Sequence, residues 1–179
     1  MENLLTAKQF FSLQDYESTD VWELIKGVLR MSPSPRPLHQ KILGDLYYIA
    51  SSKYRRHDKF HVRLAPYDVN INETSVVQPD VCVIDDISKE TNRCYEGVPI
   101  LIIEVLSPSS IKHDKQRKFE LYEECLVPEY WIVSPDDCTI QVFTLISKKY
   151  TCMGIYGEGE IIISKILPEL HVNVDDVFY

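Results

Sequence analysis

The sequence predicts an α/β fold in which a mixed central β-sheet is flanked by α-helices. Two segments, 38–53 and 110–126, carry apolar residues at the three- and four-residue spacing of an amphipathic helix. Three apolar runs of strand length, VVQPDVCVI, VPILIIEVL and EYWIV, are typical of strands in the middle of a sheet. Helices and buried strands in this order favour a sheet covered by helices.

The remaining elements follow from local turn and capping signals. Thr6 can cap a short helix, and Lys26-Gly27 can form the turn of a hairpin. In the alternating segment 61–72 the apolar phase changes at Ala65-Pro66, so we expect a break there. The expected elements are, in order, helix 6–13, hairpin 22–31, helix 38–53, strands 61–72, 76–84 and 98–106, helix 110–126, strand 129–133, and a meander of 139–145, 150–155 and 160–163 with glycine-containing turns.

Composition limits the class of protein. The chain of 179 residues fits one domain, 1–179, and its 45% hydrophobic and 26% charged content argues against disorder. No apolar run is long enough to span a bilayer, and the N-terminus lacks the features of a signal peptide, so we expect a cytoplasmic protein with no membrane partner. The five cysteines form no CxxC pair, which favours reduced structural residues over disulfides or a zinc site.

The net charge of −8 counts against a protein that coats nucleic acid without specificity. It does not exclude an enzyme that acts on nucleic acid, because a divalent-metal site needs carboxylates and phosphate contact needs only a local basic patch. The segment KYRRHDKFHVR, 53–63, is the obvious candidate for such a patch. Its alternative interpretation is a solvated helix end and loop.

Two carboxylates lie inside apolar strands, where an unpaired charge is costly. Glu104 interrupts PILIIEVLS on the same strand face as Ile102 and Leu106, and it needs a cation, a metal or a raised pKa. Asp80 follows Pro79 inside VVQPDVCVI, and proline forces an edge, a start or a bulge at that point. The alternatives are a strand-end residue that reaches solvent for Glu104 and an acidic turn for Asp80.

Lys118 lies within the apolar stripe of the helix 110–126, together with Asp114. It is either half of an ion pair with Asp114 at the core margin or a cation delivered towards the adjoining strand. With Asp80 and Glu104 it forms a chemically coherent set. Two carboxylates can hold a hard cation such as Mg²⁺ that activates water, and a lysine can stabilise the charge that develops on a phosphate.

Four ordered motifs resemble one family. They are PD at 79–80, EVLSPSS at 104–110 followed by D-x3-K-x3-Y at 114–122, VPEYWIV at 127–133, and WELIKGVLRMSPSP at 22–35. Together they resemble the Uma2 family, also known as domain of unknown function 820, whose members are described as endonucleases. The family is a branch of the PD-(D/E)xK superfamily with the restriction-endonuclease-like fold, and the resemblance covers roughly 6–133.

The resemblance implies that Asp80 and Glu104 are metal ligands for Mg²⁺ or Mn²⁺ and that DNA is the substrate. The superfamily's usual lysine position is Leu106 here, and the resemblance implies that Lys118 replaces that lysine from the following helix. Glu23 matches an acidic residue that can complete the metal site, with an ordinary strand start as its alternative. His39 could support the site or orient water, or it could be a satisfied core histidine.

Departures and alternatives complete the prediction. The family's usual glycine before VPEYW is Leu126, at an expected helix C-cap, and Tyr122 and Trp131 are expected to be core aromatics. A non-catalytic nucleic-acid-binding or regulatory module with a vestigial site is the main alternative to an endonuclease. A thiol enzyme using Cys82 or Cys125 with His39 is a third. A homodimer would supply two sites for two strands, and hydrophobic residues of the C-terminal meander could form its interface.

Overall fold

The computed structural model describes residues 4–13, 21–32, 35–56, 59–107 and 113–179. Within these residues the central sheet has six strands in the order β11-β10-β9-β8-β6-β3. In chain order the strands are β3 His61–Leu64, β6 Val81–Ile84, β8 Leu101–Val105, β9 Glu129–Ser134, β10 Thr139–Ile146 and β11 Lys149–Tyr156. The pair β8 and β9 is parallel and the other pairs are antiparallel, so the predicted mixed sheet is confirmed.

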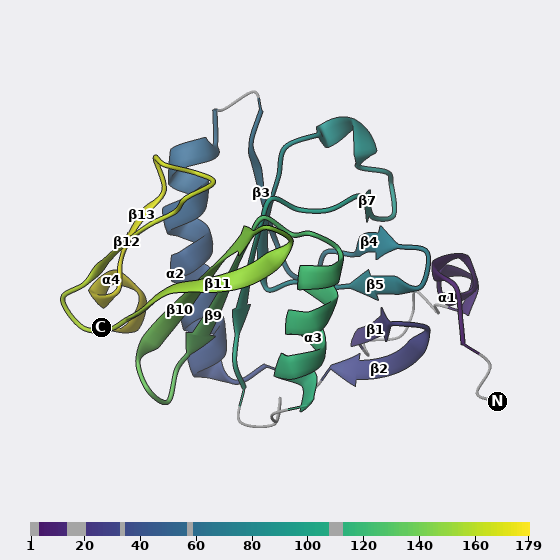
Figure 1. Cartoon of the computed structure of the whole chain (residues 1–179), viewed down its shortest axis with the longest axis horizontal. Coiled ribbons are helices and arrows are strands. Elements are labelled where there is room, and N and C mark those ends of the chain that lie inside the picture. The colour runs from purple at the N-terminus through teal and green to yellow at the C-terminus, as the bar shows by residue number, and fades with distance from the viewer. Residues whose placement is uncertain (1–3, 14–20, 33–34, 57–58, 108–112) are drawn as a thin grey trace.

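Two helices cover the two faces of this sheet, α2 (Pro37–Tyr54) behind it and α3 (His113–Glu124) in front (Figure 1). Neighbouring residues of a strand point to opposite faces, and the core divides accordingly. Ile103 of β8 packs in the cluster that contains Leu46 of α2, whereas Ile102 packs in the cluster that contains Leu121 of α3. The apolar stripes that predicted the two helices are therefore their buried faces.

A second sheet lies beside α3 and carries α1 (Ala7–Leu13) on its outer face (Figure 1). Its order is β2-β1-β5-β4-β7, with bounds β1 Val21–Ile25, β2 Val28–Ser32, β4 Val69–Asn72, β5 Ser75–Val77 and β7 Tyr95–Glu96. The predicted hairpin turn is confirmed, since Lys26 and Gly27 both have positive φ, as a two-residue turn between twisted strands requires. Thr6 caps α1, with its Oγ1 accepting from the Gln9 N–H at 3.2 Å.

The expected single strand at 76–84 is wrong. The chain forms β5 in the second sheet and β6 in the central sheet, and the three residues from Gln78 to Asp80 join them. Pro79 lacks an N–H and cannot continue a ladder, which explains why pairing stops there. The split places Asp80 at the junction of the two sheets.

The C-terminal meander is also only partly right. The turn between β10 and β11 is Ser147-Lys148, both with positive φ and without glycine. The next strand, β12 (Ile161–Ile163), pairs with β13 (His171–Asn173) instead of β11. These two strands pack with α4 (Asp175–Phe178) against the α2 side of the core. No described helix is both long and apolar enough to cross a membrane.

Glu129 shows how a buried carboxylate can be entirely structural. It is fully buried at the start of β9, where it accepts the indole N–H of Trp131 at 2.7 Å and the backbone N–H groups of Lys165 and Ile166 at 2.8 and 3.1 Å. These bonds tie β9 to the segment that follows β12. Sequence analysis did not single out Glu129, although it begins an apolar strand as conspicuously as Glu104 interrupts one.

Leu126 ends α3 in the left-handed region, with φ of 61°, so the expected C-cap is confirmed. The N–H of Val127 donates to the carbonyl of Tyr122 at 2.9 Å, and the Leu126 side chain is exposed. A Cβ in this conformation is strained, whereas glycine adopts it freely.

We expect Leu126→Gly to raise the free energy of unfolding by about 1 kcal/mol, because it removes the strain of the left-handed residue. Urea denaturation measures the change. Leu126→Ala is the matched control, since it removes the same side chain but keeps the Cβ. Equal stability of the two variants would contradict the strain argument.

Candidate metal and phosphate site

Glu104 and Lys118 form the centre of a buried charge cluster. Glu104 lies on the α3-facing side of β8 and is 9% exposed, so the alternative of a strand end that reaches solvent is wrong. Lys118 extends from α3, and its Nζ lies 3.0 Å and 3.2 Å from the two carboxylate oxygens of Glu104. One helical turn later, the hydroxyl of Tyr122 donates to Glu104 Oε1 at 2.7 Å. Each charge of the pair is thus compensated inside the protein.

Glu23 joins the cluster from the second sheet. It is buried on β1, and its Oε1 lies 3.0 Å from Lys118 Nζ and accepts the backbone N–H of Gln78 at 2.8 Å. Lys118 therefore bridges a carboxylate of the central sheet and a carboxylate of the second sheet. The alternative interpretation, an ion pair of Lys118 with Asp114, falls on a side chain outside the described part of the chain.

Asp80 approaches the same strand end from the junction of the two sheets. Its Oδ2 accepts the backbone N–H of Val105 at 2.7 Å, so the carboxylate lies beside the residue that follows Glu104. His39, near the start of α2, places Nε2 3.3 Å from Asp80 Oδ2 and 3.1 Å from the carbonyl oxygen of Val105. Asp80 therefore contacts both β8 and α2. The alternative that Asp80 is an ordinary acidic residue of a turn is wrong.

Burial and the neighbouring charges together set the pKa values in the cluster. Burial raises the pKa of Glu104 to about 7; the Lys118 ammonium opposes this rise, and the charges of Asp80 and Glu23 add to it. Burial would lower the pKa of Lys118, but the carboxylates of Glu104 and Glu23 outweigh it, so the pKa rises and the ammonium persists. A hydrogen bond to Asp80 raises the pKa of His39.

The donor set suits a hard divalent cation. Asp80 directly precedes β6 and Glu104 lies on the neighbouring strand β8, near enough for the charge of Asp80 to raise the pKa of Glu104. The Val105 carbonyl contacts His39 at the same corner. Among the described residues, no group of three or more histidine, cysteine, aspartate or glutamate side chains is arranged to hold a metal. One or two carboxylates, completed by water and substrate phosphate, are the usual protein ligands of Mg²⁺. The residues present therefore fit Mg²⁺ or Mn²⁺.

All five residues that sequence analysis selected meet at this corner: Glu23, His39, Asp80, Glu104 and Lys118. The role of Tyr122 was underestimated. It is a core aromatic as expected, but its hydroxyl binds Glu104, and only its position one helical turn after Lys118 could have suggested this. Trp131 is buried as expected and bonds to Glu129.

In the basic segment 53–63, the described residues Lys53, Arg56 and Arg63 lie away from the site or are engaged elsewhere. Arg63 makes a paired contact with Glu90, with two nitrogen–oxygen distances of 2.7 Å, and Lys53 and Arg56 are exposed at the far end of α2 from His39. Fourteen residues of helix separate Lys53 from His39, a rise of about 21 Å. Lys53 and Arg56 therefore fit the interpretation of a solvated helix end, whereas Arg63 is held by Glu90.

The cysteines give no support to a thiol enzyme. All five are free, as expected. Cys82 is buried, which raises its thiol pKa to about 12 and disfavours the nucleophilic thiolate. Cys125 is half-buried instead of fully buried, and its Sγ accepts the side-chain N–H of Asn72 at 3.2 Å. Burial also raises the pKa of this thiol.

Fold and site together define a restriction-endonuclease-like protein with a carboxylate pair and a lysine at the end of a mixed sheet. The chain matches the Uma2 family model, described as "Putative restriction endonuclease", over residues 7–175, and it belongs to this family. Its fold is similar to that of a solved structure, described as a "putative nuclease belonging to DUF820" from Anabaena variabilis ATCC 29413. That similarity has a TM-score of 0.78 at 20% identity and covers 97% of each chain. No curated protein matches the sequence.

The raised pKa of Glu104 makes stability depend on pH. With a folded-state pKa of about 7 against an ordinary value of 4.5, the folded protein binds more protons in this range, so stability falls as pH rises from 4.5 to 7. Glu104→Gln removes this titration. The free energy of unfolding of the variant, relative to that of the wild type, should therefore increase by up to about 3 kcal/mol as the pH rises from 4.5 to 7.5. Urea denaturation in EDTA at several pH values measures this, and a pH-independent difference would contradict it.

Proposed function

We propose that this protein is a Mg²⁺- or Mn²⁺-dependent endonuclease that hydrolyses phosphodiester bonds in DNA. The observation that carries the proposal is the position of Lys118, whose ammonium lies 3.0 Å from both Glu104 and Glu23 beside the carboxylate of Asp80. The Lys118 ammonium compensates the carboxylates when no substrate is bound. The same ammonium could compensate the negative charge of a phosphate when substrate binds. Membership of the Uma2 family supports a nuclease and a DNA substrate.

Asp80 and Glu104 would hold the metal, which when bound supplies a Lewis acid for phosphate oxygen and lowers the pKa of a bound water. Lys118 would stabilise the negative charge that develops on the phosphate. Glu23 holds the Lys118 ammonium from the second sheet, and the N–H of Gln78 fixes Glu23 in turn. His39 would orient Asp80 through Nε2, and its Nδ1 is a buried atom without a partner among the described residues.

A non-catalytic nucleic-acid-binding module is the second candidate, and one observation favours it. The charges of Glu104, Glu23 and Lys118 compensate each other without a metal, as they would in a vestigial site that keeps the fold. The two candidates differ in metal dependence. An endonuclease requires metal binding at Asp80 and Glu104, whereas a vestigial site does not.

We expect the wild type to nick plasmid DNA with Mg²⁺ or Mn²⁺ and not in EDTA. Asp80→Asn, Glu104→Gln and Lys118→Gln should each reduce the rate at least about 100-fold, because each removes a metal ligand or the transition-state cation. Glu120→Gln, on the exposed face of α3, is the matched control and should cleave like the wild type. Absence of cleavage by the folded wild type with either metal would favour the non-catalytic module.

Lys118 and a divalent cation compete for Glu104, so metal affinity and activity should separate. We expect Lys118→Gln to bind Mn²⁺ at least as tightly as the wild type while losing cleavage, and Glu104→Gln to bind at least about tenfold more weakly. Isothermal titration calorimetry with Mn²⁺ measures the affinities. If Lys118→Gln weakens Mn²⁺ binding as much as Glu104→Gln does, the ammonium holds Glu104 in place instead of competing for it.

We also propose a homodimer, because cleavage of both strands of a duplex is simplest with two sites, and a cytoplasmic location. Light scattering after size-exclusion chromatography tests the first, and fractionation of cells tests the second. Neither is required by the chemistry of the site.

A further inference from the structure

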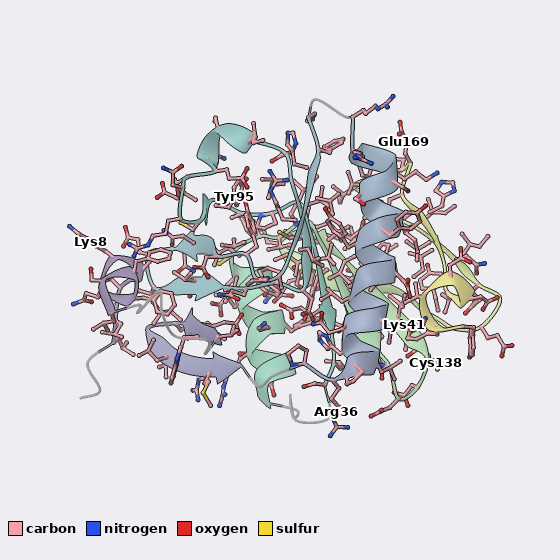
Figure 2. All side chains as sticks on the ribbon, turned by 180° about the vertical axis from the view of Figure 1, so that it is seen from behind. Lys8, Arg36, Lys41, Tyr95, Cys138 and Glu169 are labelled. Atoms are coloured by element: carbon pink, nitrogen blue, oxygen red, sulfur yellow. The ribbon has the colours of Figure 1, made fainter. Side chains whose placement is uncertain are left out.

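A strand of nucleic acid brings several phosphates to the proposed site, and Lys118 would act on the phosphate that reacts. Lys118 is itself engaged by Glu104 and Glu23. On α2, Figure 2 shows Arg36 at the site end of the helix and Glu169 near the opposite end, where Lys53 and Arg56 also lie. A phosphate next to the reacting one would be bound by a further cation near the site, and the second sheet carries one.

Arg30 supplies a cation at the appropriate place. In the antiparallel ladder of β1 and β2, Arg30 lies directly opposite Glu23. Directly opposed residues point to the same face of a sheet, with Cβ atoms about 5 Å apart. The Arg30 side chain thus shares with Glu23 the face of the second sheet that turns towards α3 and Lys118.

The guanidinium of Arg30 has unused hydrogen-bonding capacity. Its Nε is buried and has no hydrogen-bond partner among the described residues, and the residue as a whole is half-buried. A buried donor without an acceptor is costly, and a ligand oxygen that accepts from it would remove that cost. Guanidinium offers a planar fork of donors that matches a phosphate, and it keeps its charge at any physiological pH.

We propose that Arg30 binds a backbone phosphate of the nucleic acid, next to the phosphodiester that meets Asp80 and Glu104. This rests on the proposed function and deepens it. The strand would enter the site across the β1–β2 hairpin, where Arg30 lies opposite Glu23 and Lys118 contacts Glu23. In this arrangement Arg30 binds the substrate and Lys118 serves the chemistry.

Binding of a fluorescent single-stranded DNA oligonucleotide, with Ca²⁺ in place of Mg²⁺, tests the proposal at several salt concentrations. We expect Arg30→Gln to raise Kd at least about tenfold, as loss of a charge-assisted hydrogen bond does, and to reduce the slope of log K against log salt by about one. Arg56→Gln, which removes the same charge from the far end of α2, should match the wild type. Arg30→Lys should keep the salt slope but weaken binding, because the fork is lost.

A direct readout separates contact from a structural role. The Nε–H resonance of Arg30, assigned by its loss in Arg30→Gln, should shift when the oligonucleotide is added. Circular dichroism and thermal unfolding of each variant establish that it is folded. Equal affinity and salt slope for Arg30→Gln and Arg56→Gln, or an unshifted Arg30 resonance, would overturn the proposal.

The outcomes also separate this proposal from the nuclease function. Arg30-dependent binding without cleavage in Mg²⁺ or Mn²⁺ would support the phosphate contact and remove the proposed endonuclease activity. Cleavage that Arg30→Gln leaves at the wild-type rate and affinity would do the reverse. A wild-type protein that binds no oligonucleotide would overturn both.

Discussion

The ion pairs of Lys118 are the interaction on which the rest of the site depends. The Lys118 ammonium on α3 contacts Glu104 of the central sheet and Glu23 of the second sheet. A single cation therefore links the helix to both sheets. Buried ion pairs contribute little net stability, but removal of one partner is strongly destabilising because it leaves an unpaired charge behind. The cluster therefore links the two sheets through α3, and loss of any one of its charges would leave another without its partner. The hydroxyl of Tyr122 adds a neutral donor to Glu104. Both Lys118 and Tyr122 belong to α3, so the Glu104 carboxylate is bound from the helix side of β8.

The three residues between β5 and β6 connect these charges to the backbone. The N–H of Gln78 donates to Glu23 of the second sheet, and the side chain of Asp80 accepts the N–H of Val105 in the central sheet. One short segment therefore contacts both sheets at the site. Pro79 stands between them and prevents the ladder from continuing. The chain therefore leaves one sheet, places a carboxylate at the junction and enters the other sheet within the space of a turn. The break at Pro79 thus brings Asp80 to the site.

Glu104 and Glu129 show why a carboxylate in an apolar strand is an incomplete signal. Both are buried, and both carry hydrogen bonds that satisfy them. Glu129 receives N–H donors from an indole and from two backbone groups, which makes it a clamp between β9 and a distant loop. Glu104 receives an ammonium and a phenol, and Asp80 lies beside it, so its charge can be redistributed when a cation arrives. The difference lies in the kind of donor, since Glu129 accepts from neutral N–H groups only and Glu104 is paired with a cation.

The sequence by itself indicated the helices α1, α2 and α3, the hairpin turn and the choice of Asp80, Glu104 and Lys118, because periodicity, turn residues and a charge in an apolar stripe are properties of neighbouring residues. The left-handed C-cap at Leu126 was predictable for the same reason. Tertiary structure alone decided that 76–84 divides between two sheets, that β12 pairs with β13, and that Arg30 lies opposite Glu23. Strand pairing and burial depend on segments far apart in the chain. Whether a buried charge is paired or left unpaired therefore depends on how those segments pack together.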